Sequence, residues 1–296
     1  GATALAISTA SAPTEKFGHL AILAVDDNAV NREVLREALM SLGAEGDFVS
    51  NGVEAVEAAT KKHYDVIFMD GSMPEMDGFT ATKLIRDAEG RNGAKSAYVV
   101  ALTAQVRGVD ADAWAAAGAD RHMTKPFTSA RLTEALKAAG TGVRVIQPAP
   151  TPAIVGPPAT SEPSRVPEHV PAEAQLIDRE AVATMEAVGA RSGRDVVAKV
   201  WKLFLSQAPD AVFKLETLAA GSDPGAVARQ AHFLKSMSLS AGAAQLAELC
   251  EGMEQDGKAG DIAAARQKLV ATRPLLDETC AEMSRRLTAK AEAAVG

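Results

Sequence analysis

Carboxylate, hydroxyl and ammonium side chains follow apolar segments in the first half of the chain. They are Asp26, Asp27, Asp70, Thr103 and Lys125. In an alternating strand–helix chain, the carboxyl ends of parallel strands meet at one edge of the sheet, where such folds bind their ligands. Three carboxylates, a hydroxyl and an ammonium at one edge predict a divalent cation site and a phosphoryl group carried on one carboxylate.

The expected roles follow from the chemistry of each group. Asp27 and Asp70 are the expected ligands of Mg²⁺, a hard cation that prefers oxygen, and Asp26 is expected to act through a water molecule. Lys125 would supply positive charge to the phosphoryl group, and Thr103 a hydrogen bond. Taken singly, these residues have simpler interpretations as helix caps or surface charges. Their order at the ends of successive predicted strands favours the functional interpretation.

The apolar patterns predict an α/β region and then an all-α region. Strands are expected at 20–26, 45–49, 64–69, 97–102 and 119–123, and helices at 29–42, 53–62, 79–88, 105–117 and 128–139. This alternation predicts a (βα)5 doubly wound parallel sheet of the flavodoxin-like kind. After it, helices are expected at 178–189, 194–219, 223–240, 242–257 and 261–290, which predicts an antiparallel four-helix bundle.

The domain boundaries follow from changes in composition. We expect a flexible lead-in at 1–17, an α/β domain at 18–141, a Pro-rich linker at 142–175 and a helical domain at 176–296. A Pro-rich segment is semi-extended, and about 30 such residues span up to ~90 Å at ~3.1 Å each. The two domains are therefore expected to be able to meet within one chain.

Four segments of the α/β region resemble the response-regulator receiver family. They read AVDDNAVN at 24–31, MDGSMPEMDG at 69–78, ALTA at 101–104 and MTKPF at 123–127. The resemblance implies that Asp70 is the phosphoacceptor and that Asp26 and Asp27 hold Mg²⁺ with the backbone carbonyl of Ser72. It also implies that Thr103 and Lys125 contact the phosphate. Four further residues are implied to surround the docking rim: Asn28, Asn31, Ala104 and Pro126.

One residue departs from the receiver pattern. The position three before the lysine, usually aromatic in receivers, is His122. Two interpretations stay open for it: a titratable ring in place of the usual aromatic switch, or a histidine that fills surface space.

A histidine in the helical region has neighbours that suit phosphoryl transfer. On a helix, His232 shares a face with Lys235 and Ser236, while the face of Ala231 and Leu234 is small and apolar and is expected to pack the bundle. His232 is therefore expected to point outward. Lys235 could pair with an anionic phosphoimidazole, and the small Ser236 leaves room for another protein's acidic edge. An isolated histidine is more often structural, so the assignment of His232 depends on the surrounding sequence.

The surrounding sequence resembles the histidine phosphotransfer (HPt) domain. The segment AHFLKSMSLSAGA at 231–243 matches its pattern, with Ser236 where a glycine is usual. Supporting matches lie at Phe204–Leu205, at Pro209 and at 246–250. The resemblance implies that His232 is phosphorylated.

A receiver followed by an HPt domain predicts a phosphorelay segment. The phosphoryl group would pass from an upstream histidine kinase core to Asp70, then to His232 through an intrachain receiver–HPt contact, and then to a downstream response regulator receiver, or backwards. Transfer between chains stays open. The chain most resembles the C-terminal part of a hybrid sensor histidine kinase, with a free-standing relay protein as the alternative. It has no Walker A motif and is not expected to autophosphorylate from ATP.

Two other classes of protein are alternatives to the relay. A haloacid dehalogenase-type phosphohydrolase also uses Asp, Mg²⁺ and Lys, but its Asp-x-Asp motif is missing, because Asp26 and Asp27 are adjacent. A pseudo-receiver scaffold would bind partners without transfer, and the intact site residues argue against it.

Composition and charge argue against some classes of binding partner. The net charge is −7, the sequence pI is about 5.4 and aromatic residues are few, which argues against nucleic acid binding. No apolar segment reaches the ~18 residues of a membrane span. Cys250 and Cys280 have no metal-ligand spacing, so a reduced, cytoplasmic setting is expected, although a full-length parent could be membrane-anchored. The N-terminus has no signal-peptide pattern and is expected to be a cut end.

Overall fold

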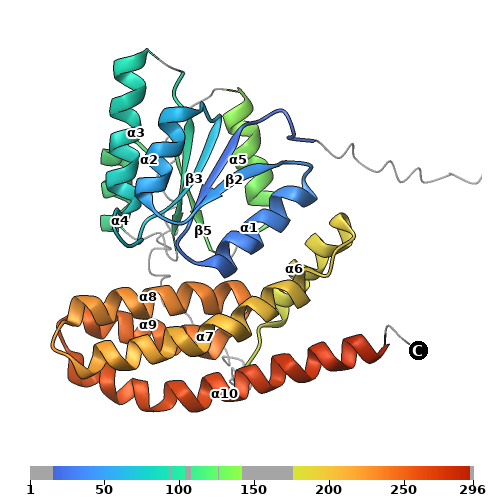
Figure 1. Ribbon diagram of the computed structural model, residues 1–296, viewed down its shortest axis with the longest axis vertical. Helices are drawn as coiled ribbons and strands as arrows, with labels where there is room; N and C mark the ends of the chain where they lie inside the picture. Colours follow the sequence, from blue (N-terminus) through green and yellow to red (C-terminus); the bar gives the residue numbers. More distant parts are fainter. Residues whose placement is uncertain (1–15, 94, 104–107, 126, 142–175, 294–296) are drawn as a thin grey trace, which may run out of the picture.

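The computed structural model describes residues 16–93, 95–103, 108–125, 127–141 and 176–293. Figure 1 shows an α/β domain above a helical domain. The strands are β1 (Ile22–Val25), β2 (Gly46–Val49), β3 (Val66–Asp70), β4 (Tyr98–Thr103) and β5 (Arg121–Thr124). The helices between and after them are α1 (Ala29–Ser41), α2 (Gly52–Lys61), α3 (Gly78–Asn92), α4 (Gly108–Ala117) and α5 (Ser129–Thr141).

The five strands form one parallel sheet in the order β2-β1-β3-β4-β5. Alternate residues of each buried strand point to opposite faces, so the sheet has two apolar layers. Ile22 and Phe68 pack with α1 and α5 on one face, whereas Leu23 and Ile67 pack with α2, α3 and α4 on the other. The register pairs Val25 with Met69, which sets the end of β1 beside the end of β3.

The helical domain contains α6 (Arg179–Ser192), α7 (Val196–Ala220), α8 (Pro224–Ala241), α9 (Ala244–Lys258) and α10 (Ile262–Ala293). Helices α7 to α10 contact one another in a closed ring, and α6 leans on α7 and α8. Asp195 and Asp223 cap α7 and α8 by accepting from backbone N–H groups of the first turn. Gly242 ends α8 with φ 78°, a left-handed conformation that favours glycine.

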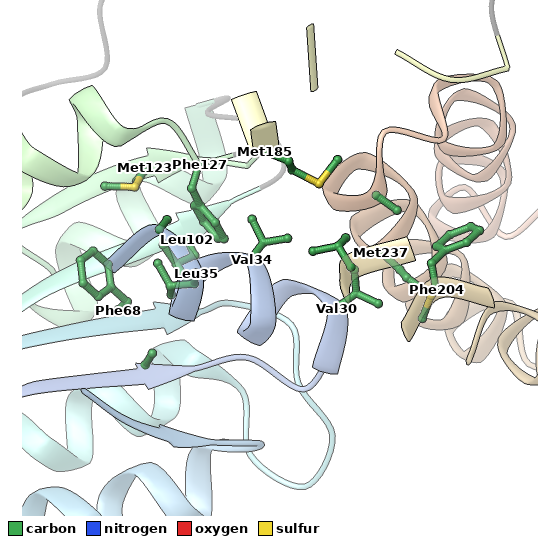
Figure 2. Close-up of a cluster of buried hydrophobic side chains, with 14 of the residues drawn as sticks. Val30, Val34, Leu35, Phe68, Leu102, Met123, Phe127, Met185, Phe204 and Met237 are labelled. Carbon is green, nitrogen blue, oxygen red and sulfur yellow. The ribbon is translucent and has the colours of Figure 1, made fainter. Parts of the chain in front are cut away.

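The two domains pack against each other through α1. This helix contacts α5 and β1 with one side and α6, α7 and α8 with the other. Figure 2 shows Val30 and Val34 of α1 between the sheet core around Phe68 and the helical core around Phe204 and Met237, and these side chains belong to one continuous buried cluster. Burial of apolar area on both sides of α1 therefore stabilises the docked arrangement.

The predicted fold class is confirmed. The strands and helices of both regions occur with ends within a few residues of those expected. One boundary is corrected: the expected flexible lead-in includes Phe17, but Phe17 is buried and its backbone N–H donates to the Leu42 carbonyl. Residues 1–15 and the expected linker at 142–175 lie outside the described residues. None of the described helices is long and apolar enough to cross a membrane.

Candidate functional site

Three carboxylates gather at the carboxyl edge of the sheet. Asp26 and Asp27 follow β1 directly, and Asp70 is the last residue of β3. One oxygen from each of the three lies within 4.8 Å of the others. Asp26 and Asp70 are buried, and Asp27 is partly exposed. The parallel register predicted this meeting of strand ends, and the structure brings the three residues together.

Burial and crowding of like charges raise the pKa values of two of these residues, Asp27 and Asp70. Burial, then the charges of Asp70 and Asp26, raises the pKa of Asp27 to about 8. Burial also raises the pKa of Asp70, against the opposing charge of Lys125. The single positive charge of Lys125 does not offset these effects, and the oxygen donors of the group are all hard ligands. Both properties fit a magnesium ion.

Lys125 links two of the carboxylates. It follows β5, and its Nζ lies 2.6 Å from Asp26 Oδ2 and 2.8 Å from Asp70 Oδ1. Burial by itself lowers the pKa of this ammonium, but the charges of Asp26 and Asp70 outweigh it and raise the pKa above its ordinary value. Lys125 is therefore permanently charged at the edge where a phosphoryl group on Asp70 would sit.

Asp26 is held in place by several donors. Its carboxylate accepts from the Asn28 backbone N–H and from Asn31 Nδ2, and its carbonyl oxygen accepts from Arg32. Asn28 also caps α1 by accepting from the Val30 N–H. The start of α1 thus fixes the orientation of the Asp26 carboxylate.

Thr103 and Ser72 complete the predicted set. Thr103 ends β4, and its buried hydroxyl has no hydrogen-bond partner among the described residues. An unpaired buried hydroxyl is costly, so it is suited to receive an incoming acceptor such as a phosphoryl oxygen. Ser72 is exposed in the loop after Asp70. Its carbonyl as a metal ligand stays a prediction, and Ala104 and Pro126 lie outside the described residues.

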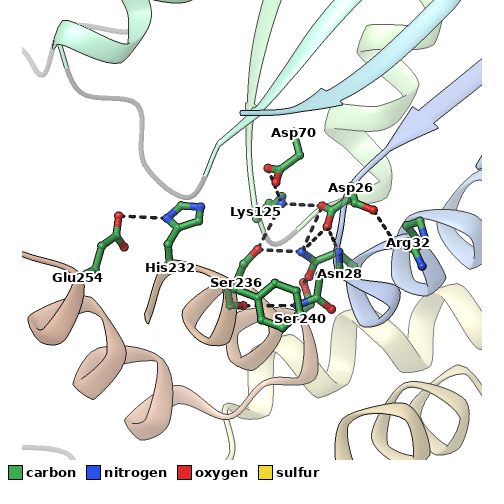
Figure 3. Close-up of polar contacts among 11 residues, drawn as sticks. Asp26, Asn28, Arg32, Asp70, Lys125, His232, Ser236, Ser240 and Glu254 are labelled. Carbon is green, nitrogen blue, oxygen red and sulfur yellow. Dashed lines mark hydrogen bonds and ion pairs between the residues drawn. The ribbon is translucent and has the colours of Figure 1, made fainter. Parts of the chain in front are cut away.

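His232 lies on α8 with a side chain that is 19% exposed, at the boundary between the domains (Figure 3). The ring contacts a residue that sequence reasoning missed: His232 Nδ1 lies 3.0 Å from Glu254 Oε1 on α9. Burial alone would raise the pKa of Glu254, but hydrogen bonds and charge from His232, Lys235 and Lys258 hold it well below its ordinary value. An ionised carboxylate only accepts, so Nδ1 carries a proton, and in the neutral ring the lone pair is then on Nε2.

Lys235 has a different partner from the one expected. The sequence suggested a lysine available to a phosphorylated His232 ring. In the structure Lys235 is buried, and its Nζ lies 2.5 Å from Glu254 Oε2. Lys258 reaches the other oxygen of Glu254 from the exposed side, at 2.6 Å. Lys235 therefore helps to hold Glu254 against His232, and direct contact with a phosphoryl group stays a prediction.

A polar network joins the two predicted phosphoacceptor sites. Ser236 Oγ accepts from Asn31 Nδ2 at 2.8 Å and from Lys125 Nζ at 3.2 Å (Figure 3). Ser240 Oγ donates to Asn31 Oδ1 at 2.6 Å, and Asn28 Nδ2 donates to the Phe233 carbonyl. The predicted place of Asn28 and Asn31 at the docking rim agrees with these contacts.

His122 lies on β5, where it pairs in register with Ala101. The ring is half-buried, and burial lowers its pKa, so it is uncharged at neutral pH. A role for this ring as the switch residue stays a prediction.

Comparison with known proteins assigns both halves of the chain. Residues 22–137 match the response regulator receiver domain, and residues 199–289 match the Hpt domain. Hybrid signal transduction histidine kinase F of Dictyostelium discoideum is 43% identical over 117 residues, which cover 39% of this chain and 11% of that protein. Sensor protein GacS of Pseudomonas syringae pv. syringae is 35% identical over 129 residues, which cover 44% of this chain and 14% of that protein.

A solved structure gives a similar match. The receiver domain of a sensor histidine kinase from Pseudomonas aeruginosa PAO1, with a magnesium ion coordinated in its active site cleft, is 37% identical. The match covers 41% of this chain and 98% of that chain, with a TM-score of 0.38. The present chain spans only 11–14% of the length of the two curated relatives above. It carries a response regulator receiver domain followed by an Hpt domain, the domain pair of a two-component phosphorelay.

Proposed function

We propose that this chain transfers a phosphoryl group between Asp70 of its receiver domain and His232 of its Hpt domain. The observation that carries the proposal is the contact of Lys125 with both partners. Its Nζ binds Asp70 Oδ1 and also Ser236 Oγ, one helical turn after His232. The residue that would neutralise a phosphoryl group on Asp70 therefore already contacts the helix that carries the acceptor imidazole.

The metal requirement follows from the acidic cluster. Asp26, Asp27 and Asp70, with the Ser72 carbonyl, would hold Mg²⁺, which when bound supplies charge neutralisation to the phosphoryl oxygens. Lys125 adds a second positive charge, and the unpaired Thr103 hydroxyl adds a hydrogen bond. These groups act mainly by position and charge, as in-line phosphoryl displacement requires.

The Hpt half supplies the nucleophile. Glu254 holds the proton on Nδ1 of His232, which leaves the Nε2 lone pair free to attack phosphorus. The new P–N bond forms as the bond between phosphorus and the Asp70 oxygen breaks, and the electron pair of that bond returns to the carboxylate. The Nδ1 proton stays beside Glu254, where the negative carboxylate offsets positive charge on the ring. The reverse transfer uses the same groups.

The wider relay is part of the same proposal. One curated relative is a hybrid signal transduction histidine kinase by name and the other is a sensor protein, so the phosphoryl group on Asp70 would come from a histidine kinase core. A downstream response regulator receiver would take it from His232. The two domains can transfer the phosphoryl group from Asp70 to His232 or from His232 to Asp70, because neither transfer consumes ATP.

The test uses the purified chain with Mg²⁺ and radiolabelled acetyl phosphate. The wild type should accumulate acid-labile, alkali-stable label, the signature of phosphohistidine, and both Asp70→Asn and His232→Ala should abolish it. Asp87→Asn and His63→Ala change exposed residues of the same types and serve as matched controls. Label that stays on Asp70 with none on His232 would contradict transfer within this chain. Sustained release of phosphate from small esters would instead favour a phosphohydrolase.

A further inference from the structure

A set of ion pairs joins α1 of the receiver domain to the Hpt domain, away from the phosphoacceptors. Lys199 Nζ lies 2.5 Å from Glu33 Oε1 and 2.9 Å from Glu37 Oε1. Arg194 Nη1 lies 3.4 Å from the same Glu37 oxygen. Glu33 and Glu37 are one helical turn apart on α1, so their carboxylates point the same way. We call these four residues the charge latch.

The latch differs from an ordinary surface ion pair in its burial. The Glu37 side chain is 0% exposed, whereas Lys199 and Arg194 are about half exposed, at 48% and 49%. Burial alone would raise the pKa of Glu37, but hydrogen bonds and charge from Lys199 and Arg194 lower it. A fully covered carboxylate without its cations would be strongly disfavoured. Burial of the ionised Glu37 carboxylate in this interface therefore requires basic side chains opposite it.

One of the two basic residues of the latch lies outside the matched Hpt region. Arg194 lies in the turn between α6 and α7, before residue 199 where the Hpt match begins. The turn is tight: a Cβ at Gly189 would lie 2.5 Å from the Arg194 carbonyl oxygen, so only glycine fits there. Helix α6 itself packs on α1. The added helix and its turn thus extend the docking surface beyond α8.

The docked receiver also covers the helix face around His232. Ser236 is buried and is bound by Asn31 and Lys125, and the Phe233 carbonyl accepts from Asn28. A second receiver would need the same face of α8. Whatever holds the chain's own receiver in place therefore limits access of any other receiver to His232.

We propose that the charge latch selects the chain's own receiver domain as the partner of its Hpt domain and, while closed, excludes a second receiver from His232. The recognised chemistry is a pair of carboxylates at i and i+4 on α1, opposite Arg194 and Lys199. This proposal rests on the proposed function, because access to His232 matters only if His232 exchanges a phosphoryl group. The docking that it requires is measurable without any phosphoryl transfer.

The first experiment measures docking in the full chain by small-angle X-ray scattering. Glu33→Lys with Glu37→Lys should raise the radius of gyration, because like charges then face each other across the interface. Adding Arg194→Glu and Lys199→Glu to the same chain should restore the wild-type value. Glu57→Lys with Asp87→Lys makes the same change in net charge at exposed positions and should leave it unchanged. Arg194→Glu with Lys199→Glu alone opens the latch from its half-exposed side, which guards against misfolding of the receiver.

The second experiment measures access to His232 with two full chains. The donor carries His232→Ala and receives phosphate on Asp70; the acceptor carries Asp70→Asn and is labelled on His232 only by transfer between chains. Adding Glu33→Lys and Glu37→Lys to the acceptor alone should raise the rate of this transfer about fivefold, the size expected for loss of partly exposed pairs.

The outcomes separate the two proposals. An unchanged radius of gyration in both latch variants, or a trans rate no faster in the opened acceptor, would overturn the latch. If the wild type shows no phosphohistidine at all, the proposed function fails, while the scattering result still decides whether the latch holds the domains together. Restoration of compactness by the four-residue charge swap supports recognition by charge rather than a general effect on folding.

Discussion

Lys125 Nζ of the receiver lies 3.2 Å from Ser236 Oγ of the Hpt helix α8, while the same ammonium lies 2.8 Å from Asp70 Oδ1. A single cation therefore contacts the phosphoacceptor carboxylate and the surface of the partner domain. When Asp70 carries a phosphoryl group, Lys125 has a stronger acceptor within reach than a neutral hydroxyl. Docking of α8 and charge neutralisation at Asp70 thus depend on the same side chain.

Replacing Ser236 with alanine tests that dependence. The substitution removes one acceptor from Lys125 and one from Asn31, a loss of about 1–2 kcal/mol in docking free energy. We expect transfer from Asp70 to His232 to slow by roughly 5–30-fold, measured as the rate of phosphohistidine formation after a pulse of acetyl phosphate.

The matched control for this prediction is Ser238→Ala on the same helix. The Ser238 hydroxyl is buried and donates to the Leu234 carbonyl, so its hydrogen bond lies within α8. It should lower the free energy of unfolding without slowing transfer. Equal rates for Ser236→Ala and the wild type would show that this contact does not serve transfer.

Glu254 is predicted to be a positioning residue for His232. Glu254→Ala removes the acceptor that keeps the proton on Nδ1, so the ring can adopt the tautomer whose Nε2 is blocked. We expect phosphorylation of His232 to slow by about tenfold or more, the effect of one charge-assisted hydrogen bond. Nuclear magnetic resonance of the ring nitrogens should report loss of the Nδ1-protonated tautomer. Glu254→Gln, which keeps an oxygen acceptor, should restore part of both.

Lys258→Ala provides the control for Glu254, because Lys258 binds the same carboxylate from the exposed side and leaves the Glu254 acceptor in place when it is removed. It should leave the tautomer unchanged. The pH dependence gives a second check. The folded pKa of Glu254 is below its ordinary 4.5, so its stabilising contribution is complete above that value and is lost as pH falls below it. Glu254→Gln should flatten that part of the stability profile; a persistent tautomer signal in Glu254→Ala would oppose the assigned role.

Much of the receiver site can be predicted from the sequence, because the ends of the strands can be predicted. The apolar segments before Asp27, Asp70 and Thr103 mark strands, and parallel pairing then brings their ends together. His232 is predictable from local helix periodicity and its motif. Phe17 was misplaced because a single aromatic before the first strand carries no periodic pattern.

Residues that act across helices or domains were not predictable from spacing. Glu254 is on a different helix from His232, and no helical period relates them. Glu33 and Glu37 read as an ordinary solvated face of an amphipathic helix, and only the docked Hpt domain shows that Glu37 is covered. Periodicity along one helix indicates which face is polar, but not which polar face is buried by another domain.

Magnesium binding is predicted to depend on pH through Asp27. In the metal-free protein its pKa is about 8, so at neutral pH a proton occupies the carboxyl group that Mg²⁺ needs. Binding must displace this proton, so affinity should rise about tenfold per pH unit up to about pH 8 and then level off. Calorimetric titrations at pH 6, 7, 8 and 9, in buffers of different ionisation enthalpy, would measure the affinity and the proton release.

The same group predicts the sign of the stability change. Its folded pKa of about 8 exceeds the ordinary 3.8, so between these values the folded protein binds more protons than the unfolded chain. Without metal, the contribution of Asp27 to the free energy of unfolding should therefore fall as pH rises from 3.8 to about 8. Bound Mg²⁺ should reverse this loss. Asp27→Asn should remove both effects, whereas Asp87→Asn should not. Affinity that is the same at pH 6 and pH 8 would contradict the assignment.

Thr103→Val is predicted to act in opposite directions on the resting and the phosphorylated protein. The Thr103 hydroxyl is buried and has no partner among the described residues, so valine should raise the free energy of unfolding by about 1 kcal/mol. The same change removes the hydrogen bond expected for a phosphoryl oxygen, so phosphorylation of Asp70 by acetyl phosphate should slow by about tenfold. Thermal melts and the initial rate of labelling measure the two effects.

Thr82→Val separates these two contributions. The Thr82 hydroxyl on α3 is also buried without a partner in the described part of the chain, but Thr82 is one turn into the helix and outside the set of residues around Asp70. It should give the same gain in stability with an unchanged rate of labelling. If Thr103→Val stabilised the protein and left the labelling rate intact, the hydroxyl would be a packing defect only, and Lys125 would be left as the main neutralising side chain at Asp70.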